Sequence, residues 1–334
     1  MQLPAKLNNS LSLSSIVRFW RHLVQRREFA VLLLFLILCT LLSLLTDTFL
    51  TFDNLSNLAR NFSWIAIIAF GQSMVIIIGG LDMSVGATMA LAGLITAYCM
   101  DENIGLPVGV AVTSGLFVGV LVGWINGFMI ARAKLPSYVV TLGTMSVVRG
   151  IAFSLTGGWP VRNLPENFRV IGQHEIQFGS WGIPVPFLLT VMTALVVGLL
   201  LDKMVLGRYV HTLNRGERAL LLAGVNVNQV TTLVYTLCGL LAAFGGIVMT
   251  ARLGVAAPTA ASGYELDSIA AAVVGGTSLY GGEGSIVGVL LGGAVLQTVR
   301  NGLVLLGFPA YGHTVAVGAM ILAVILLNYW RRKH

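Results

Sequence analysis

Charged residues are scarce in this chain. Of its 334 residues, 10% are Asp, Glu, Lys or Arg, and 56% are hydrophobic. A soluble globular protein carries about 25% charged residues, because its surface faces water. The composition therefore argues against a water-soluble enzyme. The surplus of basic residues, 20 against 13 acidic ones, does not indicate nucleic-acid binding, because these residues lie between apolar runs and not in one cluster.

Lysine and the common catalytic motifs are nearly or wholly absent. The chain has four lysines, Lys6, Lys134, Lys203 and Lys333, and none follows a glycine, so it has no phosphate-binding loop of the form G-x-x-x-x-G-K-[ST]. It also has no H-E-x-x-H and no G-x-S-x-G motif. We therefore expect that this chain does not hydrolyse ATP and that any energy for its work comes from another chain.

Cysteine and proline are few. Cys39, Cys99 and Cys238 lie inside apolar segments without C-x-x-C spacing, so we expect free buried thiols and neither a disulfide nor a metal site. The chain has 9 prolines but 39 glycines, so the glycines do not belong to a low-complexity linker. Close packing of membrane helices is the better explanation for them.

Long apolar runs make up most of the chain. The run from Ala30 to Thr46 ends at Asp47 and not at a small-residue cleavage site, which indicates a retained first span. The stretch from Leu266 to Leu279 is too short to span a bilayer alone and predicts either a half-helix or a helix extended by polar flanks. The other apolar stretches are 63–79, 84–100, 106–130, 138–155, 185–201, 230–251, 284–306 and 311–329. The sequence thus predicts an all-α integral membrane protein with about ten transmembrane segments.

The basic residues indicate the orientation of these segments. Fourteen of the 20 fall in segments 1–29, 131–137, 202–229 and 330–334. Lys and Arg concentrate in cytoplasmic loops, so both termini are predicted to be cytoplasmic. Residues 1–29 would form the N-terminal segment, 30–329 the membrane domain and 330–334 the tail.

Two hydrophilic loops stand out. The outer loop, 156–184, is rich in Gly, Pro and aromatic residues and predicts an irregular lid or docking loop. The inner loop, 202–229, contains a predicted helix of about two turns that begins near Glu217 and stops at Gly224. Its leucines need a surface to pack against, which is either the chain's own membrane domain or a cytoplasmic partner.

Short motifs recur in the same order along the two halves. The residues around Asp82 resemble those around Asp267, 185 positions later, and Asn126-Gly127 resembles Asn301-Gly302, 175 positions later. These echoes predict two related halves of five segments each, inverted in the membrane. Such halves favour a transporter, because they permit a pathway that opens to each side in turn.

Ionisable residues at membrane depth are candidates for function because their burial is costly. Asp82 and Ser84 lie in a glycine-rich break between two segments, where they either cap the next helix or belong to a gate. Glu265 and Asp267 lie in the matching outer break and have the same two interpretations. For Arg149 and Arg300 we expect snorkelling or pairing with Glu265 or Asp267. The remaining candidates for pathway residues are amides and aromatics: Asn61, Gln72, Asn126, Gln297, Asn301, Phe62, Trp64, Trp124, Trp159, Tyr264 and Tyr280.

Amides with aromatic faces suit a neutral polyhydroxylated solute, since hydroxyls need partners and the C–H face of a sugar stacks on a ring. Interfacial belts and hydrogen bonds between helices explain the same residues equally well. An ion-coupled carrier needs several carboxylates near the midplane, and only Asp82 is a fair candidate.

Over residues 50–330 the chain resembles the membrane permease subunits of ATP-binding-cassette sugar importers of the ribose, xylose and arabinose type. The motifs that carry this resemblance are 80–86 (GLDMSVG), 126–127 (NG), 135–145 (LPSYVVTLGTM), 207–209 (GRY) and 263–285 (GYELDSIAAAVVGGTSLYGGEGS). Their order and spacing are specific, although each alone is modest.

The resemblance implies a bacterial inner-membrane permease without enzymatic activity or cofactor of its own. Its implied partners are a second permease copy or paralogue, cytoplasmic ATPases that bind the ATP, and a periplasmic sugar-binding protein. It also implies a coupling helix that docks in the ATPase and that comprises Gly216, Glu217, Arg218, Ala219, Leu220, Leu221 and Gly224. The sequence departs from the usual family pattern at two places. Leu220 and Leu221 stand where family members usually have Ala-Arg, and Glu283 stands where a basic or polar residue is commoner. The rival hypothesis is a stand-alone ion-coupled sugar carrier that uses Asp82.

Overall fold

The computed structural model describes residues 27–102, 104–179 and 181–333, which form 12 helices and a two-stranded antiparallel sheet. The helices are α2 (Arg27–Leu45), α3 (Phe52–Ile77), α4 (Val85–Cys99), α5 (Val108–Ala133), α6 (Ser137–Thr156), α7 (Glu166–Gln173), α8 (Val185–Lys203), α9 (Val205–Leu222), α10 (Val227–Leu253), α11 (Tyr264–Val274), α12 (Ile286–Leu305) and α13 (Ala310–Lys333). The strands are β1 (Glu175–Phe178) and β2 (Trp181–Pro184). The predicted N-terminal segment, 1–29, lies almost wholly outside the described residues.

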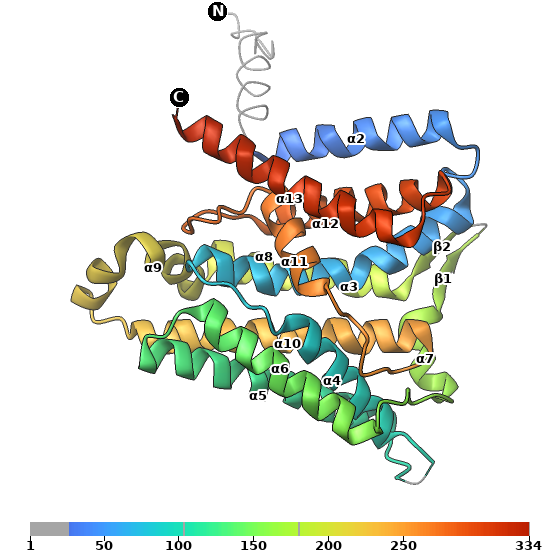
Figure 1. The fold of residues 1–334 in the computed structure, drawn as a ribbon, viewed down its shortest axis with the longest axis horizontal. Helices are drawn as coiled ribbons and strands as arrows, with labels where there is room; N and C mark the ends of the chain where they lie inside the picture. Colours follow the sequence, from blue (N-terminus) through green and yellow to red (C-terminus); the bar gives the residue numbers. More distant parts are fainter. Residues whose placement is uncertain (1–26, 103, 180, 334) are drawn as a thin grey trace, which may run out of the picture.

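Ten of these helices, all except α7 and α9, coincide with the ten predicted segments. Seven of them are long and apolar enough to cross a membrane, and α4 is a shorter apolar helix. Most helices run in the same general direction, with α9 at one end of the bundle and the β1–β2 hairpin and α7 at the other (Figure 1). The prediction of an all-α membrane protein is confirmed.

Helix α3 forms the centre of the core. Every residue from Phe62 to Ile77 is buried, and the helix packs against α8, α10, α11 and α12. A helix that is buried on all sides must be surrounded by protein or by lipid, and α3 is surrounded by protein. Helix α2 has the opposite character, since most of its leucines are exposed at the outside of the bundle.

The glycines explain how closely the helices approach. Gly115, Gly119, Gly123 and Gly127 recur every fourth residue along α5 and face α4 and α10. A Cβ on Gly119 would collide with the carbonyl oxygen of Gly239, so the backbones of α5 and α10 touch there. The expectation that glycine serves close helix packing is confirmed.

The second half of the chain repeats the element order of the first. Helices α3, α4, α5 and α6 correspond to α10, α11, α12 and α13, and the two short helices, α4 and α11, each follow a break. Packing is reciprocal, because α10 packs on α4 and α5 while α3 packs on α11 and α12. The predicted half-helix at 266–279 is α11, which ends before Gly275 and Gly276.

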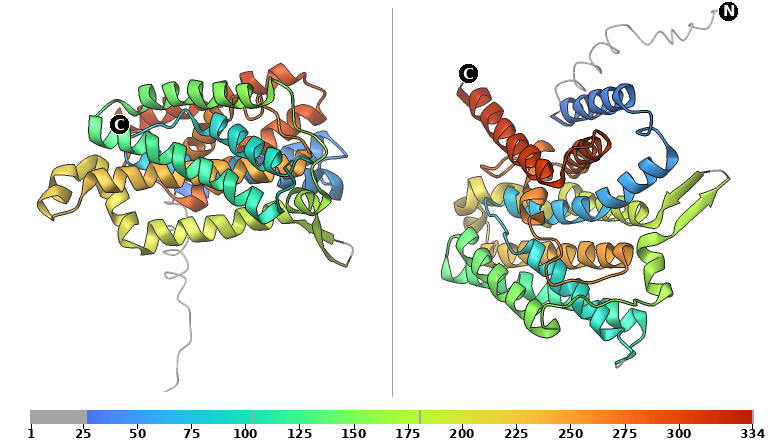
Figure 2. Two further views of the ribbon diagram at one scale, coloured as in Figure 1. Left: turned by 90° about the horizontal axis from the view of Figure 1, so that it is seen from below. Right: turned by 45° about the vertical axis from the view of Figure 1, so that its right-hand side comes forward.

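Both hydrophilic loops contain more regular structure than predicted. The outer loop is not irregular, because it holds α7 and a hairpin whose register pairs Glu175 with Pro184. Figure 2 shows this hairpin projecting beyond the helices. Gly216 is non-helical, with φ −141° and ψ 35°, and divides α9 into two helices. The second, residues 217–222, is the predicted short helix that begins near Glu217, whereas the helix before the kink, residues 205–215, was not predicted. We call residues 205–215 the α9 stem and residues 217–222 the α9 arm.

Candidate functional site

Four predicted pathway residues meet in one buried polar cluster at the inner break, residues 78–84. Asp82 Oδ1 accepts hydrogen bonds from Ser84 N at 2.8 Å and from Ser84 Oγ at 2.6 Å. Asn126 Nδ2 of α5 donates to Ser84 Oγ at 2.9 Å. The Gln72 amide, oriented to suit its neighbours, bonds the backbone N and O of Asp82 at 3.2 and 3.1 Å. All four side chains are buried, so in this conformation the cluster fixes the start of α4.

Helix α6 holds the same break from another side. Ser137 Oγ accepts a hydrogen bond from Leu81 N, and Thr141 Oγ1 accepts one from Met83 N, each at 3.1 Å. Sequence reasoning did not single out these two hydroxyls, although both lie in the 135–145 motif. The motifs at 80–86, 126–127 and 135–145 therefore meet at the break 78–84. There, side chains from the neighbouring helices provide hydrogen-bond partners for backbone that is not helical.

Charged side chains bind the backbone of the outer break, 254–263, and the first turns of α11 that follow it. Arg300 Nη2 of α12 lies 2.6 Å from Asp267 Oδ1 of α11, which confirms the expected pairing of Arg300. Arg149 of α6 behaves differently, since its Nη1 donates to the carbonyls of Pro258 and Ala260 at 2.6 and 2.7 Å. Glu265 Oε1 accepts a bond from the Gly263 backbone N at 3.2 Å. Arg149 thus anchors the loop backbone directly.

The other amide and aromatic candidates do not converge on a single cavity. Asn301 exchanges hydrogen bonds with Asn54, in the first turn of α3, at 2.7 and 3.1 Å. Phe62 and Trp64 are buried in α3, where Phe62 packs on Phe187 of α8 with ring centroids 6.3 Å apart. The remaining candidates are the half-buried Asn61, the buried Gln297, Tyr264 beside Trp64, and the exposed Trp124, Trp159 and Tyr280.

At the α9 end of the bundle, the arm presents leucines to the outside. Leu220 is 7% exposed and packs into the core, whereas Leu221 is 55% and Leu222 is 87% exposed. The arm ends at Leu222 and is followed by Gly224, whose φ of +76° suits a glycine. The chain's own membrane domain therefore buries only one of the three leucines. Arg218 and Ala219 are also exposed, and Glu217 lies 3.4 Å from Lys134 in an exposed ion pair.

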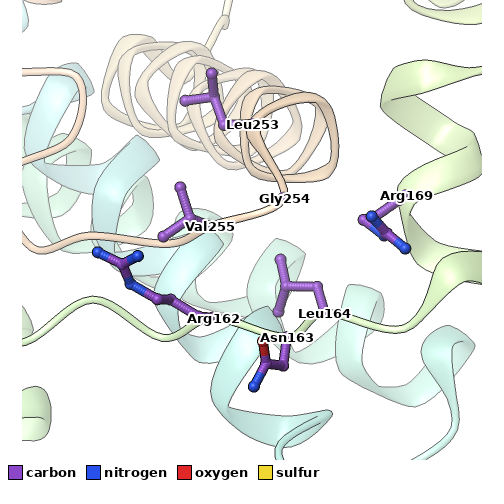
Figure 3. A pocket seen from close by; sticks show the side chains of 7 residues that line it. All are labelled: Arg162, Asn163, Leu164, Arg169, Leu253, Gly254 and Val255. Atoms are coloured by element: carbon purple, nitrogen blue, oxygen red, sulfur yellow. The ribbon is translucent and has the colours of Figure 1, made fainter.

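At the opposite end of the bundle lies a pocket of about 640 Å³. Figure 3 shows that segments 162–164 and 253–255 run along it and that Arg169 reaches it from α7. A β-bridge between Val161 and Ala256 joins the two segments, and Asn163 is held at φ +60°. None of the predicted pathway residues lines this pocket, and its two arginines suit an anionic group better than a neutral solute. Its lining residues are Arg162, Asn163, Leu164, Arg169, Leu253, Gly254 and Val255.

Two halves with the same element order, and seven helices long and apolar enough to cross a bilayer, are the architecture of a multi-pass membrane protein. The family model described as "Branched-chain amino acid transport system / permease component" matches residues 54–325, and the chain belongs to this family. The motif-based resemblance is thereby confirmed.

Curated relatives carry more specific names. The chain is 39% identical over 298 residues to the ribose import permease protein RbsC of Escherichia coli K12, covering 89% of this chain and 92% of that protein. It is 40% identical over 294 residues to RbsC of Bacillus subtilis 168, covering 87% and 89%. It is 34% identical over 307 residues to the L-arabinose transport system permease protein AraH of E. coli K12, covering 92% of each. No solved structure matches the chain.

Proposed function

We propose that this chain is the permease subunit of an ATP-binding-cassette importer that carries a monosaccharide or a similar polyhydroxylated solute across the bacterial inner membrane. Its relatives named for ribose and arabinose transport support the solute class. The observation that carries the coupling to an ATPase is the α9 arm, where Leu221 and Leu222 are exposed on a helix that the membrane domain anchors through Leu220. Exposed apolar residues on a short, firmly held helix suit a docking contact with another protein.

Transport in this proposal proceeds by alternating access. The two short helices follow breaks that are hydrogen-bonded by neighbouring helices, so each can move as a unit when its joint is displaced. Separate ATPase subunits supply the energy, and a second permease copy or paralogue completes the pore. With both termini cytoplasmic, the α9 arm faces the ATPases. The pocket beside Arg162 and Arg169 then faces the periplasm, from which a sugar-binding protein would approach.

The proposal differs from a stand-alone ion-coupled carrier in what transport requires. Asp82 is enclosed and accepts two hydrogen bonds at the start of α4, which favours a structural role over ion exchange with water. We expect proteoliposomes with this chain, its ATPase and its binding protein to take up sugar only when ATP is supplied on the ATPase side. Uptake without an ATPase, driven by an ion gradient and abolished by Asp82→Asn, would instead establish the carrier.

A further inference from the structure

The α9 stem touches both places where the membrane helices are interrupted near the α9 end of the bundle. One is the inner break, 78–84, between α3 and α4, and the other is the turn 275–285 between α11 and α12. Asn214, in the last turn of the stem before the kink at Gly216, donates a hydrogen bond from Nδ2 to the Tyr280 carbonyl. A side chain from the inner loop is thus bonded to the backbone of the second half.

Two glycines make room for the Asn214 amide. A Cβ placed on Gly79 would collide with Asn214 Oδ1, and a Cβ placed on Gly281 would collide with Asn214 Nδ2. Both glycines also have positive φ angles, +86° and +73°, which other residues adopt at a cost. The amide is therefore seated between the inner break and the 275–285 turn, in contact with each.

Further bonds join the same three segments. Gly282 N donates to the carbonyl of Ile77, the last residue of α3, at 2.7 Å. Arg215 Nη2 lies 2.9 Å from Glu283 Oε1, and His211 Nδ1 lies 3.4 Å from the Gly282 carbonyl oxygen. Glu283 of the turn thus faces a basic residue of the stem. Stem, break and turn form one connected body.

We propose that Asn214 is a positioning residue that clamps the α9 stem to both helix interruptions, so that displacement of the α9 arm moves α4 and α11 together. This inference rests on the proposed function. The kink at Gly216 separates the two tasks: the arm presents Leu221 and Leu222 to a partner, and the stem holds the interruptions. The inner break leads directly into α4, and the 275–285 turn follows directly on α11. One side chain thus links both halves of the permease to one cytoplasmic contact.

The test measures sugar uptake and ATP hydrolysis by the reconstituted importer. In Asn214→Ala and Asn214→Leu we expect the amount of sugar taken up per ATP hydrolysed to fall about tenfold, while co-purification of the ATPase stays at the wild-type level. Thr212→Ala is the matched control, because Thr212 lies on the same stem, is exposed and bonds only the Arg208 carbonyl one turn earlier. An unchanged ratio in both Asn214 variants, or loss of the ATPase from the complex, overturns the clamp.

A cross-link tests whether stem and turn move as one body. Cysteines replace Arg215 and Glu283 in a chain in which Cys39 and Cys99 are serine, and a short bis-methanethiosulfonate joins them. We expect the cross-linked importer to keep its ATP-driven uptake within about twofold of the unlinked protein, because a linkage within one rigid body blocks no motion. A block of uptake that a reductant reverses contradicts the proposal. Wild-type uptake that needs no ATPase would instead refute the proposed function, so the two failures are distinguishable.

Discussion

Two aspartates at equivalent places in the sequence have different partners in the structure. Asp82 accepts hydrogen bonds from Ser84, a neutral residue two positions later in the same break, whereas Asp267 faces the cation of Arg300. A buried carboxylate needs either several donors or an opposite charge, and the two breaks use one solution each. The pairing of Arg300 could be predicted because few basic residues lie within apolar segments. The cluster around Asp82 could be predicted only in part, since Ser84 lies two residues away but Asn126, which donates to Ser84, comes from another helix.

The Asp267–Arg300 ion pair yields a stability prediction. The two side chains are 4% and 20% exposed, so Arg300→Ala leaves a carboxylate largely buried without its partner. We expect the detergent-solubilised protein to lose about 3 kcal/mol of unfolding free energy, measured by chemical denaturation. The double variant Asp267→Asn with Arg300→Gln should recover most of the loss.

Lys134→Ala is the control for the Arg300 variant, because it removes an exposed pair with Glu217 at 3.4 Å. Such pairs contribute less than about 1 kcal/mol. An Arg300→Ala protein as stable as Lys134→Ala would show that the buried pair contributes nothing to the fold.

The two exposed leucines of the α9 arm give a functional prediction. Leu221→Glu places a charge on the exposed end of the arm without disturbing the core contact of Leu220. We expect ATP-driven uptake and co-purification of the ATPase to fall, because a carboxylate disfavours an apolar contact, while the protein still inserts in the membrane. Ile176→Glu in the β1–β2 hairpin is the control, since Ile176 is similarly exposed but lies at the opposite end of the bundle. Wild-type uptake in Leu221→Glu would remove the arm from consideration as the coupling contact.

At the scale of elements, apolar run length predicted the membrane helices well. Each of the ten predicted segments is a helix, because a long apolar run can satisfy its backbone in a bilayer only as helix. The elements that sequence reasoning missed are polar or short. The α9 stem carries charged and polar residues that break the apolar pattern, and the β1 and β2 strands have four residues each, too few for a detectable alternation.

Helix contacts made through glycine give a prediction at the same scale. Gly119→Leu drives a side chain into the carbonyl of Gly239 on α10, so we expect a loss of at least about 1–3 kcal/mol in unfolding free energy. Gly150→Ala in α6 is the matched control, since a Cβ there meets no atom within 4 Å and alanine favours the helix. Thermal denaturation in detergent should place Gly119→Leu well below wild type and Gly150→Ala at or slightly above it. Equal stability of both variants would refute the close α5–α10 contact.

For the whole molecule, the repeat could be predicted from motif spacing but its packing could not. The echo between residues 82 and 267 indicated two halves, whereas the reciprocal contacts of α3 and α10 depend on side chains that meet only after folding. The same holds for the Asn214 contacts, because Gly79, Asn214 and Gly281 are far apart in the sequence and each is unremarkable alone.

The orientation of the whole molecule is open to a direct test. If both termini are cytoplasmic, Leu222→Cys on the α9 arm should react with a membrane-impermeant maleimide only after the membrane is opened. Arg162→Cys, in the pocket at the opposite end, should react in intact spheroplasts. We expect a labelling ratio of about tenfold in each direction, read by gel shift in a background without Cys39 and Cys99. The reverse pattern would invert the topology.

The burial of α3 has a consequence for how the chain is made. Of the seven long spans, α3 is the least apolar and the most enclosed, and much of what encloses it is α10, α11 and α12. These partners are synthesised more than 150 residues later, so α3 enters the bilayer before the protein that will surround it exists. The first half therefore cannot complete its core during its own synthesis. Assembly of this permease is a late event, which waits for the last third of the chain to leave the ribosome.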